Sequence, residues 1–131
     1  MLEWDHKYDI GHGRIDAEHR IFLSLIADFQ QAVLLQASNA KQYRILAEII
    51  SYAAFHFISE ENIMIDCDYP ERERHSSLHN LLLAEIKHKC AQFKHGEING
   101  EEVFEFLFHW FVLHTTHEDK KLADFSGTAN T

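Results

Sequence analysis

The sequence is poor in cysteine, and this argues against several kinds of site. Its two cysteines, Cys67 and Cys90, do not form a Cys-x-x-Cys motif, so a thiolate metal site is not indicated. Residues 1–5 lack the basic and then apolar pattern of a secretion signal. We therefore expect both cysteines to be reduced thiols in a cytoplasmic protein rather than partners in a disulfide.

Long hydrophobic runs and an excess of positive charge are also missing. No apolar run approaches the roughly 20 residues that span a bilayer, so we expect no membrane insertion. Twelve lysines and arginines stand against 21 aspartates and glutamates, and the formal net charge is −9. Nucleic acids and anionic membrane surfaces are bound by basic patches, so neither is an expected partner.

The sequence does contain enough apolar material for one core, and it contains an unusual amount of histidine. Its 131 residues, 46% of them hydrophobic, suit a single compact domain, which we expect to be a monomer. Eleven histidines are several times the usual share. Such an excess makes metal binding or pH sensing worth testing.

The spacing of the apolar residues predicts four successive amphipathic helices. From Ile15 to Val33, apolar residues repeat at alternating steps of four and three, which places them on one face of a helix over 17–36. Pro70, the only proline, suits the first position of the third helix. The three further helices predicted in this way run over about 40–64, 70–95 and 101–122.

Four helices of similar length with short connections indicate an all-α fold. The sequence has no alternation of the kind that predicts strands, so we expect an up-down-up-down four-helix bundle. The expected organisation is an irregular N-terminal arm over 1–16, the bundle over 17–122 and a flexible C-terminal tail over 123–131.

Polar residues interrupt the apolar stripes of all four predicted helices. A polar group inside a bundle costs free energy unless it is satisfied, and a cluster of imidazoles and carboxylates is best satisfied by metal. A single His-x-x-x-Glu pair is more often a surface pair, but here each helix contributes at least one such residue. Two metal ions inside the bundle are the leading interpretation. The seven candidate ligands are His19, His56, Glu60, His75, His79, His114 and Asp119.

Helix geometry alone does not choose the last of these ligands. Asp119 follows His114 by five residues, which in a regular α-helix rotates it by about 140°. Glu118 has the regular spacing of four, and His117 is a further contender. A π-bulge, which adds one residue to a turn, would bring Asp119 onto the face of His114.

Taken together, these motifs resemble the ligand set of the hemerythrins, most closely that of the single-domain bacteriohemerythrins. The resemblance extends from Trp4 to Leu122 and includes His19 within Ile-Asp-Ala-Glu-His. It favours Asp119 over Glu118 and His117. It implies two non-haem irons with a bridging oxo or hydroxo group: His75, His79 and His114 on one iron, His19 and His56 on the other, and Glu60 and Asp119 bridging both.

The resemblance also implies a function. Counting donors for two octahedral ions leaves one position open, on the iron held by His19 and His56. In the family this position binds dioxygen reversibly, so we expect an oxygen carrier, store or delivery protein rather than an enzyme. An oxygen-consuming enzyme or a reductase would be further partners. The alternatives are a di-iron oxidase or peroxidase, for which the helical Glu85-x-x-His88 lies off the stripe, and an oxygen or redox sensor.

An apolar lining would keep water and protons away from such a centre. Phe111 and Thr115 differ from the leucine and isoleucine common in the family, so the resemblance does not give the oxygen affinity or the autoxidation rate. The aromatic candidates could equally be ordinary core residues. The expected lining consists of Trp110, Phe111, Phe22, Phe55 and Thr115, with Phe57 nearby. The remaining histidines, expected at the surface or around the ligands, are His6, His12, His88, His95, His109 and His117.

Overall fold

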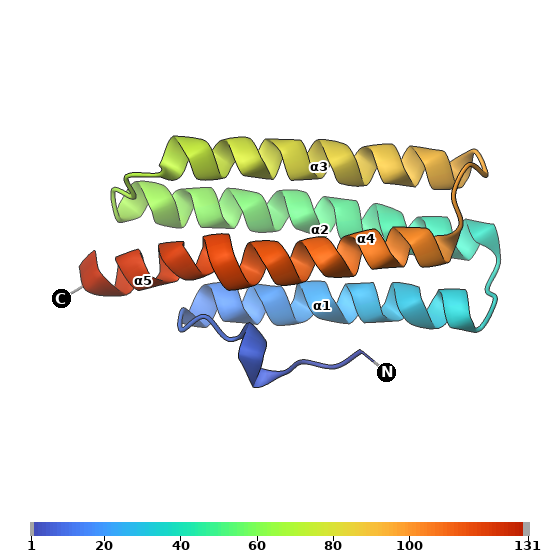
Figure 1. Cartoon of the computed structure of the whole chain (residues 1–131), viewed down its shortest axis with the longest axis horizontal. Helices are drawn as coiled ribbons and strands as arrows, with labels where there is room; N and C mark the ends of the chain where they lie inside the picture. Colours follow the sequence, from blue (N-terminus) through green and yellow to red (C-terminus); the bar gives the residue numbers. More distant parts are fainter. Residues whose placement is uncertain (1, 130–131) are drawn as a thin grey trace.

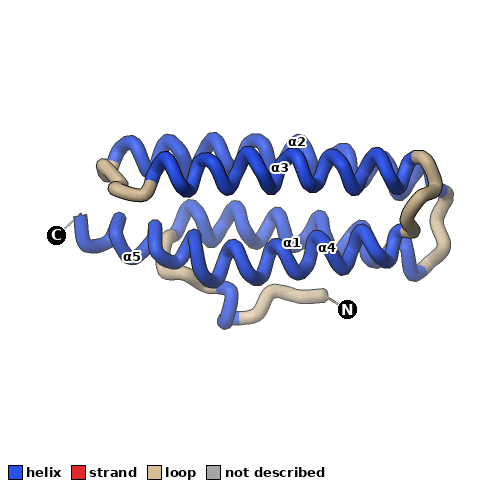
Figure 2. Tube along the Cα trace, turned by 45° about the horizontal axis from the view of Figure 1, so that its top comes forward, coloured by secondary structure: helices blue, strands red, loops and turns tan. Residues whose placement is uncertain are grey.

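The computed structural model describes the backbone of residues 2–129 and the side chains of residues 2–127. Within this range the chain forms helices and no strand, which confirms the predicted four-helix bundle. Figure 1 shows long helices that lie side by side with alternating direction, and Figure 2 shows the same bundle turned by 45°. The helices are α1 (Gly13–Leu34), α2 (Asn39–Asp66), α3 (Arg72–Lys94) and α4 (Gly100–Leu113), the last continued by the π-helical turn η2 (His114–Asp119) and by α5 (Lys120–Ala129).

Polar side chains begin three of these helices by capping free backbone amides. His12 Nδ1 accepts a hydrogen bond from the amide of Ile15 at the start of α1 (3.2 Å). Ser38 and Asn99 cap α2 and α4 in the same way. The cap at His12 starts α1 at Gly13, so the predicted start at residue 17 was wrong and the N-terminal arm is shorter than 1–16.

Three helices end in the same hydrogen-bonded turn, in which one residue adopts a left-handed backbone. This residue is Gln36 after α1 (φ 54°), Asp68 after α2 (φ 54°) and Gly96 after α3 (φ 74°). In each case the next residue's amide returns to a carbonyl five residues earlier, as from Ala37 to Ala32 (2.9 Å). Pro70 lies in the turn before α3, which begins at Arg72, so its predicted place as the first helical residue was wrong.

The C-terminal segment is helical where the sequence predicts a loose tail. The predicted end at Leu122 and flexible tail from 123 were wrong for 123–129, because α5 continues to Ala129. Leu122, Ala123 and Ser126 are buried there, and the first two belong to a second core cluster that includes Ile15 and Met64. Residues 130 and 131 of the predicted tail lie outside the described range.

The N-terminal arm packs along the bundle and contains one 3-10 turn, η1 (His6–Tyr8). Tyr8 is buried, and its ring meets the ring of Phe111 from α4 edge to face, with centroids 5.8 Å apart. Arg20 of α1 lies over the ring of Trp4 and pairs with Asp9 (3.4 Å). These contacts hold the arm against the bundle.

Among residues 2–129, none of the helices combines the length and apolar character needed to cross a lipid bilayer.

Candidate metal centre

All seven predicted ligands meet inside the bundle, and none is more than 7% exposed. They come from every helix of the bundle, because each apolar stripe turns its polar residues inward along with its apolar ones. α1 supplies His19, α2 supplies His56 and Glu60, α3 supplies His75 and His79, and η2 supplies His114 and Asp119.

The seven side chains form two overlapping groups, in each of which the facing nitrogen and oxygen atoms lie within 4.8 Å of one another. Glu60 and Asp119 belong to both groups. The first group contains three histidines and the second only two. The groups are Glu60, His75, His79, His114 and Asp119, and His19, His56, Glu60 and Asp119.

Each shared carboxylate has one oxygen near each group. Glu60 Oε1 lies 3.0 Å from Nε2 of both His75 and His79, whereas its Oε2 lies 2.8 Å from Nε2 of His56. The carboxylate of Asp119 is divided in the same way. Its Oδ1 is 3.1 Å from His114 Nε2, and its Oδ2 is 2.9 Å from His19 Nε2.

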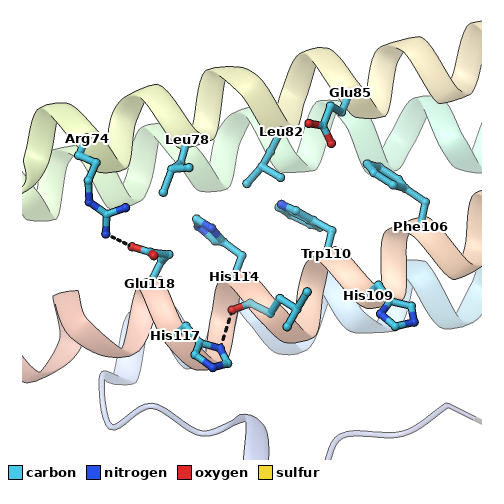
Figure 3. Close-up of a pocket in the computed structure, with 11 residues that line it drawn as sticks. Arg74, Leu78, Leu82, Glu85, Phe106, His109, Trp110, His114, His117 and Glu118 are labelled. Atoms are coloured by element: carbon cyan, nitrogen blue, oxygen red, sulfur yellow. Dashed lines mark hydrogen bonds and ion pairs between the residues drawn. The ribbon is translucent and has the colours of Figure 1, made fainter.

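A π-helical turn brings Asp119 into the centre. Residues His114–Asp119 have one residue more per turn than an α-helix allows, so the spacing of five returns Asp119 to the inward face. The proposed π-bulge is confirmed. Glu118 instead pairs with Arg74 of α3, and the Nδ1 atom of exposed His117 lies 3.0 Å from the carbonyl of Leu113 (Figure 3).

The donor atoms fit a shared cation. Within the described residues, Glu60 Oε2, His114 Nε2 and both carboxylate oxygens of Asp119 are buried without any hydrogen-bond partner. They lie close to opposite charges but lack the angles of hydrogen bonds, and polar atoms buried in this way are uncommon. Five imidazole nitrogens with two carboxylates suit first-row transition metals such as iron, zinc or manganese.

The pKa values of the metal-free centre also support a site for a cation. Burial raises the pKa values of Glu60 and Asp119, but the surrounding histidines lower them more, so both carboxyls titrate below their ordinary range. Burial lowers the pKa of His56, yet the charge of Glu60 and a hydrogen bond to Glu18 raise it to about 10. Burial lowers the pKa of His75, yet the nearby carboxylates of Asp119 and Glu60 raise it to about 9. Bound metal would take the place of these protons.

Four of the five predicted lining residues are buried beside the centre. The ring of Phe111 lies 5.8 Å from that of His19, and the ring of Phe22 lies 6.3 Å from that of His56. Trp110 stacks on His114 at 6.0 Å. These three aromatic residues and Thr115 are at most 8% exposed.

Phe55 is the exception, and its prediction as a lining residue was wrong. It is 52% exposed and its ring neighbours that of Tyr52 on the outer side of α2. A position one residue before inward-facing His56 is turned by about 100° on a helix. Phe57 has the corresponding place in the interior and stacks on His79, with ring centroids 4.1 Å apart.

Sequence reasoning missed Glu18, a buried carboxylate next to the centre. His56 Nδ1 donates to its Oε1 and Ser59 Oγ donates to its Oε2, each at 2.7 Å. The signal was present, because Glu18 follows Ile15 by three residues and precedes Phe22 by four on the apolar stripe of α1.

The centre comes nearest to solvent at a groove between α3 and α4. This groove has a volume of about 510 Å³, and its apolar lining includes Leu78, Leu82 and Trp110 (Figure 3). His114 reaches it and is 7% exposed, whereas each of the other six side chains is at most 2% exposed. His109 lies at the same groove and is itself exposed, which agrees with its expected place outside the ligand set.

Comparison with known proteins agrees with this geometry. The bacteriohemerythrin of Pseudomonas aeruginosa is 27% identical over 127 residues, which cover 94% of this chain and 80% of that protein. The bacteriohemerythrin of Clostridium acetobutylicum is 25% identical over 134 residues, covering 95% of this chain and 100% of that protein. A hemerythrin-like protein of Naegleria gruberi is 21% identical over 121 residues, or 92% of this chain and 89% of that protein.

The sequence profile of the hemerythrin HHE cation binding domain matches residues 11–125, a range that contains all seven side chains of the centre. The cluster of buried histidines and carboxylates thus lies within a cation-binding domain of a known family. The resemblance drawn from the motifs is confirmed, and the chain belongs to the hemerythrin family.

Proposed function

We propose that the protein binds dioxygen reversibly at a non-haem di-iron centre, as an oxygen carrier, store or delivery protein. The observation that carries this proposal is the asymmetry of the two groups: three histidines face one side of the shared carboxylates and two face the other. With His75, His79 and His114 on one iron and His19 and His56 on the other, donor counting leaves a free position on the second. When bound, the two irons supply that position and the electrons that hold dioxygen there.

The protein's own contribution is to hold the donors and exclude water. The side of the centre with the free position faces Phe22 and Phe111, which are each 1% exposed. An apolar wall of this kind slows the entry of water and protons, which would turn reversible binding into oxidation.

The surroundings of the centre support binding rather than catalysis. Among residues 2–127, the only acidic or basic side chains buried to this extent are the seven donors and Glu18, which is occupied by His56 and Ser59. Among these residues, no further buried carboxylate, imidazole or amine is therefore placed to act as a general acid or base on a substrate. We infer that the protein is not an enzyme, and that an oxygen-consuming enzyme or a reductase would be its functional partner.

The test is the visible spectrum of the anaerobically reduced, iron-loaded protein while oxygen is admitted and then purged. A new absorption band that forms with oxygen, disappears on purging and survives several cycles is the expected result. Zinc-loaded protein is the control and should show no band, because zinc has no redox chemistry. A one-way conversion to the diferric form would point to an oxidase, a peroxidase or a sensor, and the absence of any oxygen-dependent band would contradict oxygen binding.

A further inference from the structure

His56 differs from three of the other histidines in the centre by having a partner behind its ring. Its Nε2 faces Glu60 inside the centre, while its Nδ1 donates to Glu18 at 2.7 Å. Within the described part of the chain, the Nδ1 atoms of His19, His75 and His79 are buried without a hydrogen-bond partner. The carboxylate behind His56 therefore makes the two sides of the centre electrostatically unequal.

Glu18 is itself held in place from three directions. Ser59 Oγ donates to Oε2 at 2.7 Å, and Arg14 Nε donates to the same oxygen at 3.1 Å. The hydroxyl of Tyr52 also donates to the backbone carbonyl of Glu18 at 3.0 Å. Together with the bond from His56, the bonds from Ser59 and Arg14 favour the ionised carboxylate, and they leave it little freedom to move away from His56.

We propose that Glu18 is a positioning residue of the centre, with two effects on the same side. It fixes the ring of His56 so that Nε2 points at the shared carboxylates, and its negative charge stabilises the more positive, oxidised state of the iron that His56 holds. The inference rests on the proposed function only in that His56 must bind metal. It adds that the free coordination position belongs to the iron held by His56, and that Glu18 makes this histidine a stronger electron donor to its metal.

The test is Glu18→Gln, which keeps the size of the side chain and a hydrogen-bond acceptor but removes the charge. The affinity for metal, measured by competition with a chelator, should fall by about 10–100-fold, the effect typical of removing a carboxylate behind a ligating histidine. The reduction potential of the iron centre, measured anaerobically, should shift to a more positive value. Ser59→Ala is the matched control, because it removes one hydrogen bond to Glu18 and leaves both the charge and the bond to His56.

The outcomes separate this inference from a simple packing role. If Glu18→Gln and Ser59→Ala lower the melting temperature alike and leave the reduction potential at the wild-type value, Glu18 only supports the fold and the inference is overturned. An unchanged metal affinity and an unchanged reduction potential in Glu18→Gln would overturn it as well. Both readouts are taken without oxygen, so a wild-type protein that holds iron but does not bind oxygen reversibly contradicts the proposed function alone. A wild-type protein that holds no metal contradicts both.

Discussion

Asp119 and Glu118 are adjacent acidic residues with opposite surroundings. Asp119 is fully buried between the two histidine groups, whereas Glu118 pairs with Arg74 at the surface. The difference depends on the one residue added to the turn after His114. At the scale of single residues, the direction in which an acidic side chain points from the helix therefore decides whether it reaches the centre, more than whether it is Asp or Glu.

This contrast gives a paired prediction. Asp119→Ala removes a shared carboxylate and should weaken metal binding by more than the roughly 10–100-fold typical of a residue that only supports a ligand. Glu118→Ala should retain the wild-type metal content, because only its pairing with exposed Arg74 is lost. The measurement is metal per chain after dialysis against a chelator. Equal losses in the two variants would contradict the role of Asp119.

At the scale of helices, the three identical chain reversals differ in the residue that carries the left-handed backbone. α3 is followed by Gly96, for which a positive φ is free of steric cost, but α1 is followed by Gln36. Gln36→Gly should therefore stabilise the protein by about 0.5–1 kcal/mol. The converse variant, Gly96→Gln, should destabilise it by a similar amount, since nothing crowds that position. Urea unfolding of the two variants measures both signs, and a destabilised Gln36→Gly would count against the prediction.

The N-terminal arm offers a second prediction at this scale. Tyr8 is 4% exposed and covers Phe111, which in turn faces His19. Tyr8→Ala should cost about 3–5 kcal/mol, as for other large aromatic residues, and should admit water to this side of the centre. We expect a lower melting temperature and faster air oxidation of the reduced iron-loaded protein. His6→Ala is the control on the same turn, because its side chain is 99% exposed. Unchanged oxidation in Tyr8→Ala would show that the arm does not shield the centre.

The elements that could and could not be predicted differ in where their information lies. The four helices and six of the seven donors follow from a local period of 3.6 residues, which is visible in the sequence itself. Asp119 does not follow from it, because this residue reaches the inward face only through the π-helical turn. α5 could not be predicted, because Ser126 and Gly127 are typical of a loose tail and the burial of Ser126 comes from tertiary packing. Phe57 is buried and Phe55 is not because the two residues point in different directions from the axis of α2. The role of Glu18 depends on a contact between two helices, α1 and α2, in which it accepts a hydrogen bond from His56.

At the scale of the whole molecule, the centre places buried charge in the middle of the bundle. Removing the metal should lower the melting temperature. Metal at about a thousand times its Kd contributes roughly 4 kcal/mol, on the order of 10–20 °C for a chain of this length. Melting curves before and after chelation test this, and equal melting temperatures would contradict a metal bound in the core.

The metal-free protein should also lose stability both when the pH falls and when it rises. Glu60 and Asp119 have lowered pKa values, so their contribution is lost as the pH falls below their ordinary values near 4. His79, whose pKa is lowered by burial, adds to the loss on the acid side. His56 and His75 have raised pKa values, so their contribution is present below pH 6.5 and is lost as the pH rises toward about 10 and 9.

We therefore expect the metal-free protein to be most stable at about pH 6. In the metal-loaded protein the alkaline decline should disappear, because the histidines are already deprotonated by their metal. Melting temperatures from pH 5 to 10, with and without metal, measure both effects. A metal-free protein whose stability does not fall between pH 7 and 10 would contradict the pairing of His56 and His75 with the carboxylates.

The π-helical turn also sets the orientation of the last helix, α5. One added residue advances every later side chain by about 100°, and Leu122, Ala123 and Ser126 are buried with that advance included. In genetic terms, the gene carries one codon here that an uninterrupted helix would not need. Deleting it would keep an acid on the inward face, now four residues from His114, yet it would turn the buried face of α5 toward water. We therefore expect the packing of α5, as well as the centre, to require the added residue.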